Sequence, residues 1–264
     1  MNSIKTMNSM KAFASGVRAT GFTMNHSAPK HIVSSGGRKF SSNFRYRLSQ
    51  PEPFSNNAVL YGLIGANVGV YGLWKMSEQD PRLRRKLWNH MTVSHRGVIR
   101  EHQYHTLITS MFSHADGWHL FGNMFTLYFF GASAIPVLGA RKFLAMYLGG
   151  GVFSSLCHIA APSLIPRSWP ASRSFSQYSQ ALGASGAIGA TVAYSILLNP
   201  KGTVLLYGLI PIPTFLFGIG YIAQDALGLY QGDTGTGNAA HLGGAFWGAA
   251  TFAYMKMGKG GRFR

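Results

Sequence analysis

Apolar residues gather in six long segments that contain no Asp, Glu, Lys or Arg. These segments cover residues 53–74, 117–140, 143–166, 174–200, 202–224 and 234–255 and are 22 to 27 residues long. A helix needs about 20 residues to cross the hydrocarbon core of a bilayer, and a charged side chain at its centre is costly. The apolar–polar alternation of a membrane β-barrel strand is missing from the segments. The pattern therefore predicts an all-α, polytopic membrane protein, a bundle of six transmembrane helices in a lipid bilayer.

Small residues are concentrated in the fourth and the last of these segments. The chain has 33 glycines among its 264 residues, and helices in lipid associate by close backbone approach at small residues. Ala240, Gly244 and Gly248 recur at every fourth position of the last segment, and Gly183 and Gly186 belong to a small-residue cluster in the fourth. We therefore expect the fourth and sixth helices to touch.

Pro211 and Pro213 fall near the middle of the fifth segment. A proline inside a helix lacks the N–H donor and disrupts the hydrogen-bond ladder. The fifth helix is therefore expected to be kinked or loosened there. A static kink is one interpretation, and a lateral gate that swings away from the second helix to admit a substrate is the other.

Charge is scarce and unevenly distributed. Charged residues make up 12% of the chain, although the formal net charge is +17, whereas a soluble domain has about 25% charged residues. A chain so poor in charge lacks the water-soluble, charged face of a nucleic-acid-binding protein, so no nucleic-acid partner is expected. Cys157 is the single cysteine, which excludes a disulfide scaffold.

The first 51 residues hold eight of the 24 basic residues and no acid. A basic, serine-rich and acid-free stretch is typical of an organelle transit peptide, and the sequence around Phe40 resembles a mitochondrial processing site. We predict a transit peptide over 1–40, a linker over 41–56, the six-helix domain over 57–256 and a basic tail over 257–264. A chloroplast transit peptide and a disordered basic arm at a membrane surface are the alternatives.

Four polar side chains lie inside the predicted helices, where such groups are costly and mark functional sites. His119 and Asn123 are one turn apart in the second segment, Ser185 lies in the fourth, and His241 lies near the start of the last. Helices two, four and six of a six-span chain run in the same direction. The four side chains are therefore expected to meet in one shallow, water-accessible pocket.

These residue types suit nucleophilic catalysis. A serine beside a histidine is the basis of an activated nucleophile, so His241 is expected to act as general base for Ser185. The Asn123 amide, the His119 ring and the backbone N–H of Ser185 are suitable donors for the oxyanion of a tetrahedral intermediate. The sequence thus predicts a serine hydrolase site within a membrane.

The group that orients the histidine is left open. Asp225 and Asp233 fall in the predicted loop before the last helix, so a Ser–His dyad is predicted, with a third member possible but unsupported. No metal or cofactor is expected, because His114, Asp116 and His119 lack the ligand number and spacing of a tetrahedral zinc site.

Three motifs resemble those of the rhomboid intramembrane serine proteases: GxSG at 183–186, HxxxN at 119–123, and Ala-His followed by a small-residue repeat at 240–248. The resemblance covers about 57–256 and implies a rhomboid-like fold with Ser185 as the nucleophile and His241 as the base. It also implies single-pass transmembrane protein substrates, cleaved in or near the bilayer. The residues to which it gives supporting roles are His119 and Asn123 for the oxyanion and Gly183, Gly186, Gly244 and Gly248 for the structure around the site.

The sequence also departs from this family. Many rhomboids have a Trp-Arg pair in the first loop where this chain has Tyr104-His105, which affects lateral anchoring rather than the chemistry. Mitochondrial rhomboids often carry a seventh helix ahead of the six, and 1–52 has no apolar run for it. A six-helix organelle form is therefore expected.

The predicted location is the mitochondrial inner membrane, with multiple passes, and a chloroplast membrane is the alternative. Basic residues flank the segments on both sides, so the positive-inside rule gives a mixed answer. We expect the termini in the matrix and the active site open to the intermembrane space. Two rival functions are a non-catalytic rhomboid-like binder of transmembrane helices and a transporter or haem-carrying bundle that uses His119 and His241.

Overall fold

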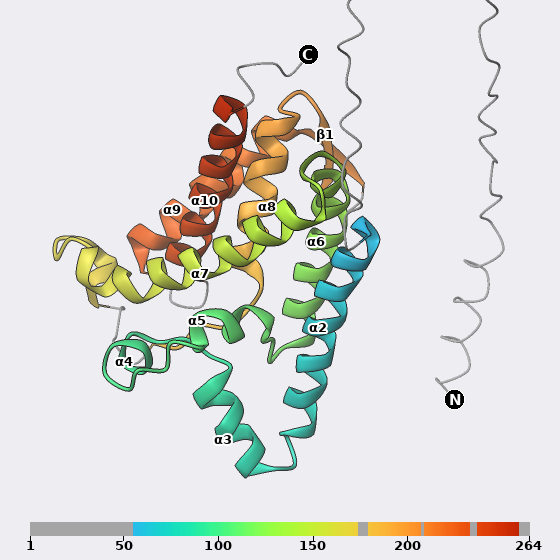
Figure 1. Cartoon of the computed structure of the whole chain (residues 1–264). Coiled ribbons are helices and arrows are strands. Elements are labelled where there is room, and N and C mark those ends of the chain that lie inside the picture. The colour runs from blue at the N-terminus through green and yellow to red at the C-terminus, as the bar shows by residue number, and fades with distance from the viewer. Residues whose placement is uncertain (1–54, 174–178, 207–208, 233–236, 259–264) are drawn as a thin grey trace, which may run out of the picture. The chain divides into compact units, whose positions relative to one another are not determined.

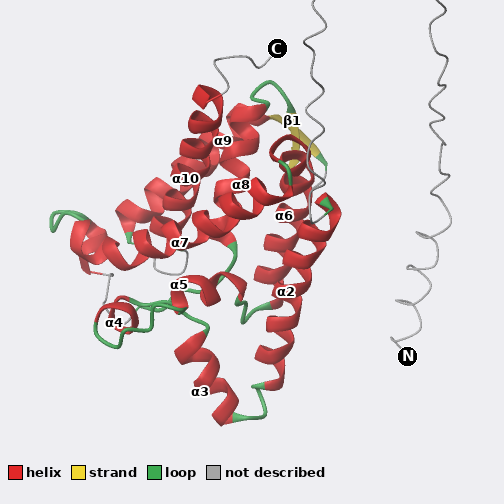
Figure 2. Ribbon diagram, viewed as in Figure 1, coloured by secondary structure: helices red, strands yellow, loops and turns green. Residues whose placement is uncertain are grey.

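A computed structural model describes residues 55–173, 179–206, 209–232 and 237–258. This part of the chain is mostly helical (Figures 1 and 2). The long helices are α2 (Asn56–Met76), α6 (Gly117–Leu138), α7 (Ala140–Leu164), α8 (Ser185–Leu198), α9 (Thr214–Gln231) and α10 (Asn238–Gly258). The shorter elements are α3 (Pro81–His90), α4 (His95–Ile99), α5 (Thr106–Thr109), η1 (Ser110–Phe112), η2 (Pro170–Arg173), β1 (Thr203–Leu206) and β2 (Ile210–Pro213). The predicted transit peptide, most of the predicted linker and 259–264 lie outside the described residues.

Four of the six predicted helices, those now seen as α2, α6, α7 and α10, lie close to their predicted positions. Local chemistry sets their ends. Ser55 Oγ accepts a hydrogen bond from Ala58 N at the start of α2, and Asp116 Oδ1 accepts one from His119 N at the start of α6. Such side-chain caps satisfy N–H groups that have no partner inside the helix. Gly139, with φ of +78°, separates α6 from α7.

In the described part of the chain, two helices, α6 and α7, are long and apolar enough to cross a membrane by length and composition. The apolar helix α8 is shorter, at 14 residues. The bundle of six transmembrane helices is thus a prediction that the described helices support only in part.

The fourth helix begins only at Ser185, and not within the stretch from 174 onward that the sequence predicts. Ala181 pairs with Val93 through two backbone hydrogen bonds of 2.8 Å, and Gly183 N donates to Ser110 O at 3.0 Å. Gly183 has φ of +129°, a conformation that right-handed helices do not contain. These hydrogen bonds to the α2–α6 connection keep the helix from starting earlier. Ser185 is therefore its first residue.

The predicted kinked fifth helix is wrong. Residues 203–206 and 210–213 form an antiparallel pair of strands, in which Thr203 lies opposite Pro213, and α9 begins only at Thr214. Proline fixes φ and biases the preceding residue to an extended conformation, so the alternation Ile-Pro-Ile-Pro favours extended backbone over a helix, and proline is tolerated at the edge of a sheet. The two-stranded sheet also corrects the all-α prediction, and α9 has no proline to act as a hinge.

The centre of the fold is α8, which packs against α6, α7 and α10 (Figure 1). Its contact with α10 is a backbone contact, as predicted. A Cβ atom added to Gly244 would overlap the carbonyl oxygen of Gly186, and one added to Gly248 would overlap the carbonyl oxygen of Ala190. Only glycine at these positions lets the two helices approach so closely.

Gly248→Ala is expected to destabilise the protein, because the added methyl group must push α10 away from α8. Overpacking of a close contact costs about 1–3 kcal/mol. The matched control is Gly65→Ala in α2, where an added Cβ meets nothing within 4 Å and helix propensity improves by about 1 kcal/mol. Thermal unfolding in detergent measures both variants. Equal melting temperatures for the two would contradict this account of the interface.

Candidate active site

The structure brings together the serine and the histidine that the sequence singles out. Ser185 is the first residue of α8, and His241 lies in the first turn of α10. Ser185 Oγ and His241 Nε2 are 2.8 Å apart. Because the contact of Gly186 with Gly244 lies one turn or less from both residues, the helix interface holds this pair at hydrogen-bonding distance.

An acid lies beside His241, a position that the sequence left open. Asp225 Oδ1 is 2.9 Å from His241 Nδ1, and the Asp225 side chain is only 6% exposed. Asp225 belongs to α9, which continues to Gln231 and ends at Gly232 in a left-handed conformation. The sequence-based helix stopped at residue 224 because a charge follows it. This charge is tolerated inside the helix because it is bound to the histidine. Asp233 lies outside the described residues.

The three side chains form one hydrogen-bonded chain. If Nδ1 of His241 donates to Asp225, then Nε2 carries the lone pair that accepts the Ser185 hydroxyl proton. This is the tautomer that a general base for a serine nucleophile requires. Both ring nitrogens are thereby engaged, which leaves neither of them for a haem iron and disfavours the haem-carrying interpretation.

The four predicted site residues line one cavity of about 780 Å³. His119 and Asn123 reach it from α6, and Ser185 and His241 reach it from α8 and α10. Gly183 also lines the cavity, and a Cβ at this position would lie 2.8 Å from His119 Cε1. The missing side chain therefore leaves room for the His119 ring next to the nucleophile.

His114 was not assigned to the site from the sequence, although it holds several site residues in place. It is fully buried, and its Nε2 lies 2.9 Å from Asn123 Nδ2 and 3.3 Å from the backbone N of Ala184. A backbone N–H only donates, so Nε2 is the acceptor and the proton is on Nδ1. Burial, and then the neighbouring His119, lower the pKa of His114 to about 3, which keeps the ring neutral.

The contacts of His114 determine what Asn123 can do. One amide N–H of Asn123 is directed to His114, and the second is left for the cavity. The ring of His114 also packs edge-on against His119, with centroids 5.0 Å apart. Its Nε2 lone pair, the one that a metal ion would need, is already used by the two donors. The spacing of His114 from Asn123 carries no helical periodicity, because His114 precedes α6, so sequence reasoning had no signal for this contact.

One family model and several curated proteins match the sequence of this chain. A family model described as "Rhomboid domain" matches residues 101–257. RHOMBOID-like protein 12, mitochondrial, of Arabidopsis thaliana is 36% identical over 209 residues, which are 78% of this chain and 60% of the relative. Presenilin-associated rhomboid-like protein, mitochondrial, of Homo sapiens is 32% identical over 192 residues, 71% of this chain and 45% of the relative.

Rhomboid protein 1, mitochondrial, of Saccharomyces cerevisiae is 31% identical over 192 residues, which are 72% of this chain and 51% of the relative. The chain thus spans about half the length of the curated relatives it matches. The family match covers more than half of this chain and includes every residue of the site described above. The chain therefore belongs to the rhomboid family.

Proposed function

We propose that the protein is an intramembrane serine endopeptidase that cleaves single-pass transmembrane substrates in or near the bilayer. The observation that carries the proposal is the hydrogen-bonded chain from Ser185 through His241 to Asp225, which opens on a cavity of about 780 Å³. A hydroxyl, an imidazole and a carboxylate in this order are the parts of an activated serine nucleophile.

The proposed mechanism follows from the contacts. His241 takes the proton of Ser185 as Oγ attacks the scissile carbonyl, and it gives this proton to the leaving amine. The tetrahedral intermediate carries a negative oxygen, for which Asn123 and His119 supply donors. The first N–H groups of α8 have no partner within the helix and add to this site. A water molecule then hydrolyses the ester on Ser185, with His241 again as the base.

The membrane setting is proposed from the helices. We assign α2, α6, α7, α8, α9 and α10 as the six spans. Helix α8 has 14 residues, so its length is about 21 Å, against about 30 Å for the hydrocarbon core. Ser185 at its first position therefore lies below the membrane surface, where the cavity brings water to it.

The proposed location is the mitochondrial inner membrane, because the relatives named above are mitochondrial proteins. The active site is proposed to open to the intermembrane space. A chloroplast membrane is the alternative, and fractionation of the two organelles separates them.

A fluorophosphonate, which labels activated serines, tests the proposal together with a cleavage assay on a single-pass transmembrane substrate. The protease hypothesis requires labelling of Ser185 and cleavage by the wild type, with both lost in Ser185→Ala. The rival, a non-catalytic binder of transmembrane helices, predicts that the substrate is retained uncut and that Ser185 is not labelled.

His114→Phe is expected to lower kcat/KM by about 10²-fold, because it removes the acceptor that orients the Asn123 amide; loss of one oxyanion donor costs about 10²–10³. Asn123→Ala is expected to have a similar effect, and the double variant should be little worse than either, since both act through one hydrogen bond. His114→Gln, whose carbonyl oxygen can accept, should lose less than His114→Phe. If the fold-losses in kcat/KM of the two single variants multiplied in the double variant, this coupling would be contradicted.

The mature N-terminus is expected near Ser41, because the acid-free stretch before it has the composition of a removable transit peptide. These residues lie outside the described ones, so the prediction rests on the sequence. N-terminal sequencing of the protein from isolated mitochondria measures it. A protein recovered with Met1 intact, or outside any organelle, would remove the transit peptide.

A further inference from the structure

Helix α3, which follows α2, carries a row of exposed cations. Arg82, Arg84, Arg85 and Lys86 are all exposed, and within the described part of the chain none of their side chains forms an ion pair or a hydrogen bond. Four adjacent positive charges without counter-charges repel one another, so a nearby anion would stabilise them.

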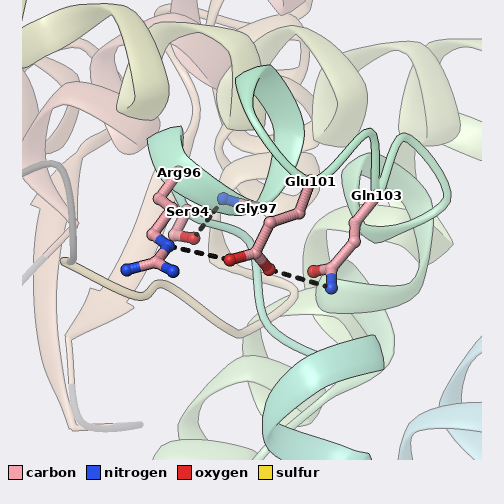
Figure 3. Close-up of polar contacts among 5 residues, drawn as sticks. All are labelled: Ser94, Arg96, Gly97, Glu101 and Gln103. Carbon is pink, nitrogen blue, oxygen red and sulfur yellow. Dashed lines mark hydrogen bonds and ion pairs between the residues drawn. The ribbon is translucent and has the colours of Figure 1, made fainter.

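The acids between α2 and α6 are all engaged elsewhere. Glu78 pairs with Lys75 at 2.8 Å, and Asp80 caps the start of α3 through backbone N–H groups. Glu101 holds Arg96 at 2.8 Å and accepts from Gln103 (Figure 3). The remaining acid, Asp116, caps α6. Within the described residues between α2 and α6, no acid is therefore left to pair with the cations of α3.

The helix is amphipathic, and its cations face away from the protein. At about 100° per residue, Arg82, Arg85 and Lys86 fall in one arc, opposite Leu83 and Leu87. Leu87 is 5% exposed and Leu83 is half-buried, so the apolar side packs on the body of the protein. We call Arg82, Arg85 and Lys86 the cationic face of α3.

The end of α3 is fastened next to α2. The ring of Trp88 packs edge-on against Trp74, with centroids 5.3 Å apart, and His90 Nδ1 lies 3.1 Å from His105 Nε2. Figure 1 shows α3 joined by a short turn to the end of α2. Helix α2 ends at Met76 and α3 begins at Pro81, so the cationic face cannot move far from the end of α2.

We propose that the cationic face of α3 docks on the phosphate headgroups of an anionic lipid surface, on the side of the membrane to which the active site opens. The inference rests on the proposed function, because it takes α2 as a transmembrane helix. If α2 spans the bilayer, a helix separated from its end by a turn of only four residues lies at headgroup level. Basic clusters in this position bind anionic lipid, and arginine matches the geometry of a phosphate group.

A membrane fits the face better than an acidic protein segment, because the α2–α6 connection is tied at both ends to proposed spans. Its cations therefore stay within a Debye length of the surface.

The experiment places a fluorophore on Asn89→Cys, an exposed position on the cationic side of α3, in the full-length Cys157→Ser protein. The protein is reconstituted in nanodiscs of phosphatidylcholine alone or of phosphatidylcholine with phosphatidylglycerol. Quenching by acrylamide, an uncharged reagent, reports exposure of the label to water. Phosphatidylglycerol is expected to protect the label, and high salt is expected to remove the protection.

The variant Arg82→Gln/Arg85→Gln/Lys86→Gln is expected to lose the protection. Each cation near an anionic surface strengthens association roughly fivefold, so the loss of three weakens docking roughly a hundredfold. The matched control is Lys142→Gln/Lys201→Gln/Lys256→Gln. It removes three exposed cations near the start of α7, after the end of α8 and near the end of α10, which the proposed spans place on the other side of the membrane from α3. This control should keep the protection. Labelling of Ser185 by a fluorophosphonate and gel filtration show that both variants are folded.

Equal quenching in the two kinds of nanodisc would overturn the proposal. Protection by soluble polyglutamate, with none from phosphatidylglycerol, would also overturn it and assign the face to an acidic protein segment. Lack of substrate cleavage with lipid-dependent protection intact would count against the protease function only. A chain that fails to co-float with phosphatidylcholine vesicles would contradict both proposals, because α3 would then have no membrane beside it.

Discussion

Ser185→Ala and His241→Ala are each expected to abolish cleavage of a transmembrane substrate. The oxygen of Ser185 lies 2.8 Å from Nε2 of His241, so either change removes the proton transfer that makes the nucleophile reactive. Residues that act as a unit in this way each account for a factor of about 10⁶ in kcat in a serine protease. The double variant should therefore be no worse than either single variant.

Purified protein in proteoliposomes, mixed with a single-pass substrate, gives this measurement. Ser133→Ala is the matched control, because it removes a serine from helix α6 that contacts Phe130 and Ser195 rather than the cavity. The control should cleave at the wild-type rate. Robust turnover by Ser185→Ala would refute the mechanism, whatever the effect of the other variants.

The sequence brought the candidate site into view because its polar residues stand out against apolar surroundings. Ser185, His241, His119 and Asn123 would be costly groups in lipid, so their positions marked them as candidates, and helix direction predicted that they would meet at one cavity, as they do. The same logic found the contact of α8 with α10, since glycine at 244 and 248 has no other benefit in a helix. Residue patterns that cost free energy unless they serve a contact or a function can thus be recognised from the sequence alone.

The errors have a common cause. A charge-free segment shows that a stretch is apolar, but it does not show where a helix starts or stops. Residues 179–184 stay outside the helix because Ala181 pairs with Val93 and Gly183 donates to Ser110, both far away in sequence. The strand at 210–213 depends on its partner at 203–206. Long-range hydrogen bonds set the first boundary, and no local pattern records them. At 210–213 the Ile-Pro alternation is a local signal for extended backbone, but a count of charge-free residues does not detect it.

Asp225 is a different kind of error. The charge-free segment ends at residue 224, before Asp225, but helix α9 continues past this charge to Gln231. Its carboxylate is held within α9 by a hydrogen bond to His241, so the structure tolerates it where the sequence rule excluded it. His114 was missed for a similar reason, because its role depends on contacts with Asn123 and Ala184 that sequence spacing does not encode. Both residues support groups that the sequence did identify.

Asp225→Asn is expected to lower kcat by about 10³–10⁴-fold, close to the effect of the same change in serine proteases with a triad. The asparagine fills the same volume but offers its amide N–H or its oxygen to Nδ1 of His241. When the amide donates, Nδ1 must accept, and the proton moves to Nε2, where it blocks the transfer from Ser185. The amide also lacks the negative charge that stabilises the imidazolium formed during the reaction.

The measurement is kcat for a transmembrane substrate, combined with the rate of fluorophosphonate labelling of Ser185, which should fall in parallel. Asp80→Asn is the matched control, since Asp80 caps the exposed helix α3 and does not line the cavity; it should leave both rates unchanged. If Asp225 only supports folding, Asp225→Asn should lower the melting temperature and leave the labelling rate of the folded protein intact. A cleavage rate within a few-fold of wild type would show that Ser185 and His241 work as a dyad, and that the 2.9 Å contact of Asp225 with His241 does not contribute to catalysis.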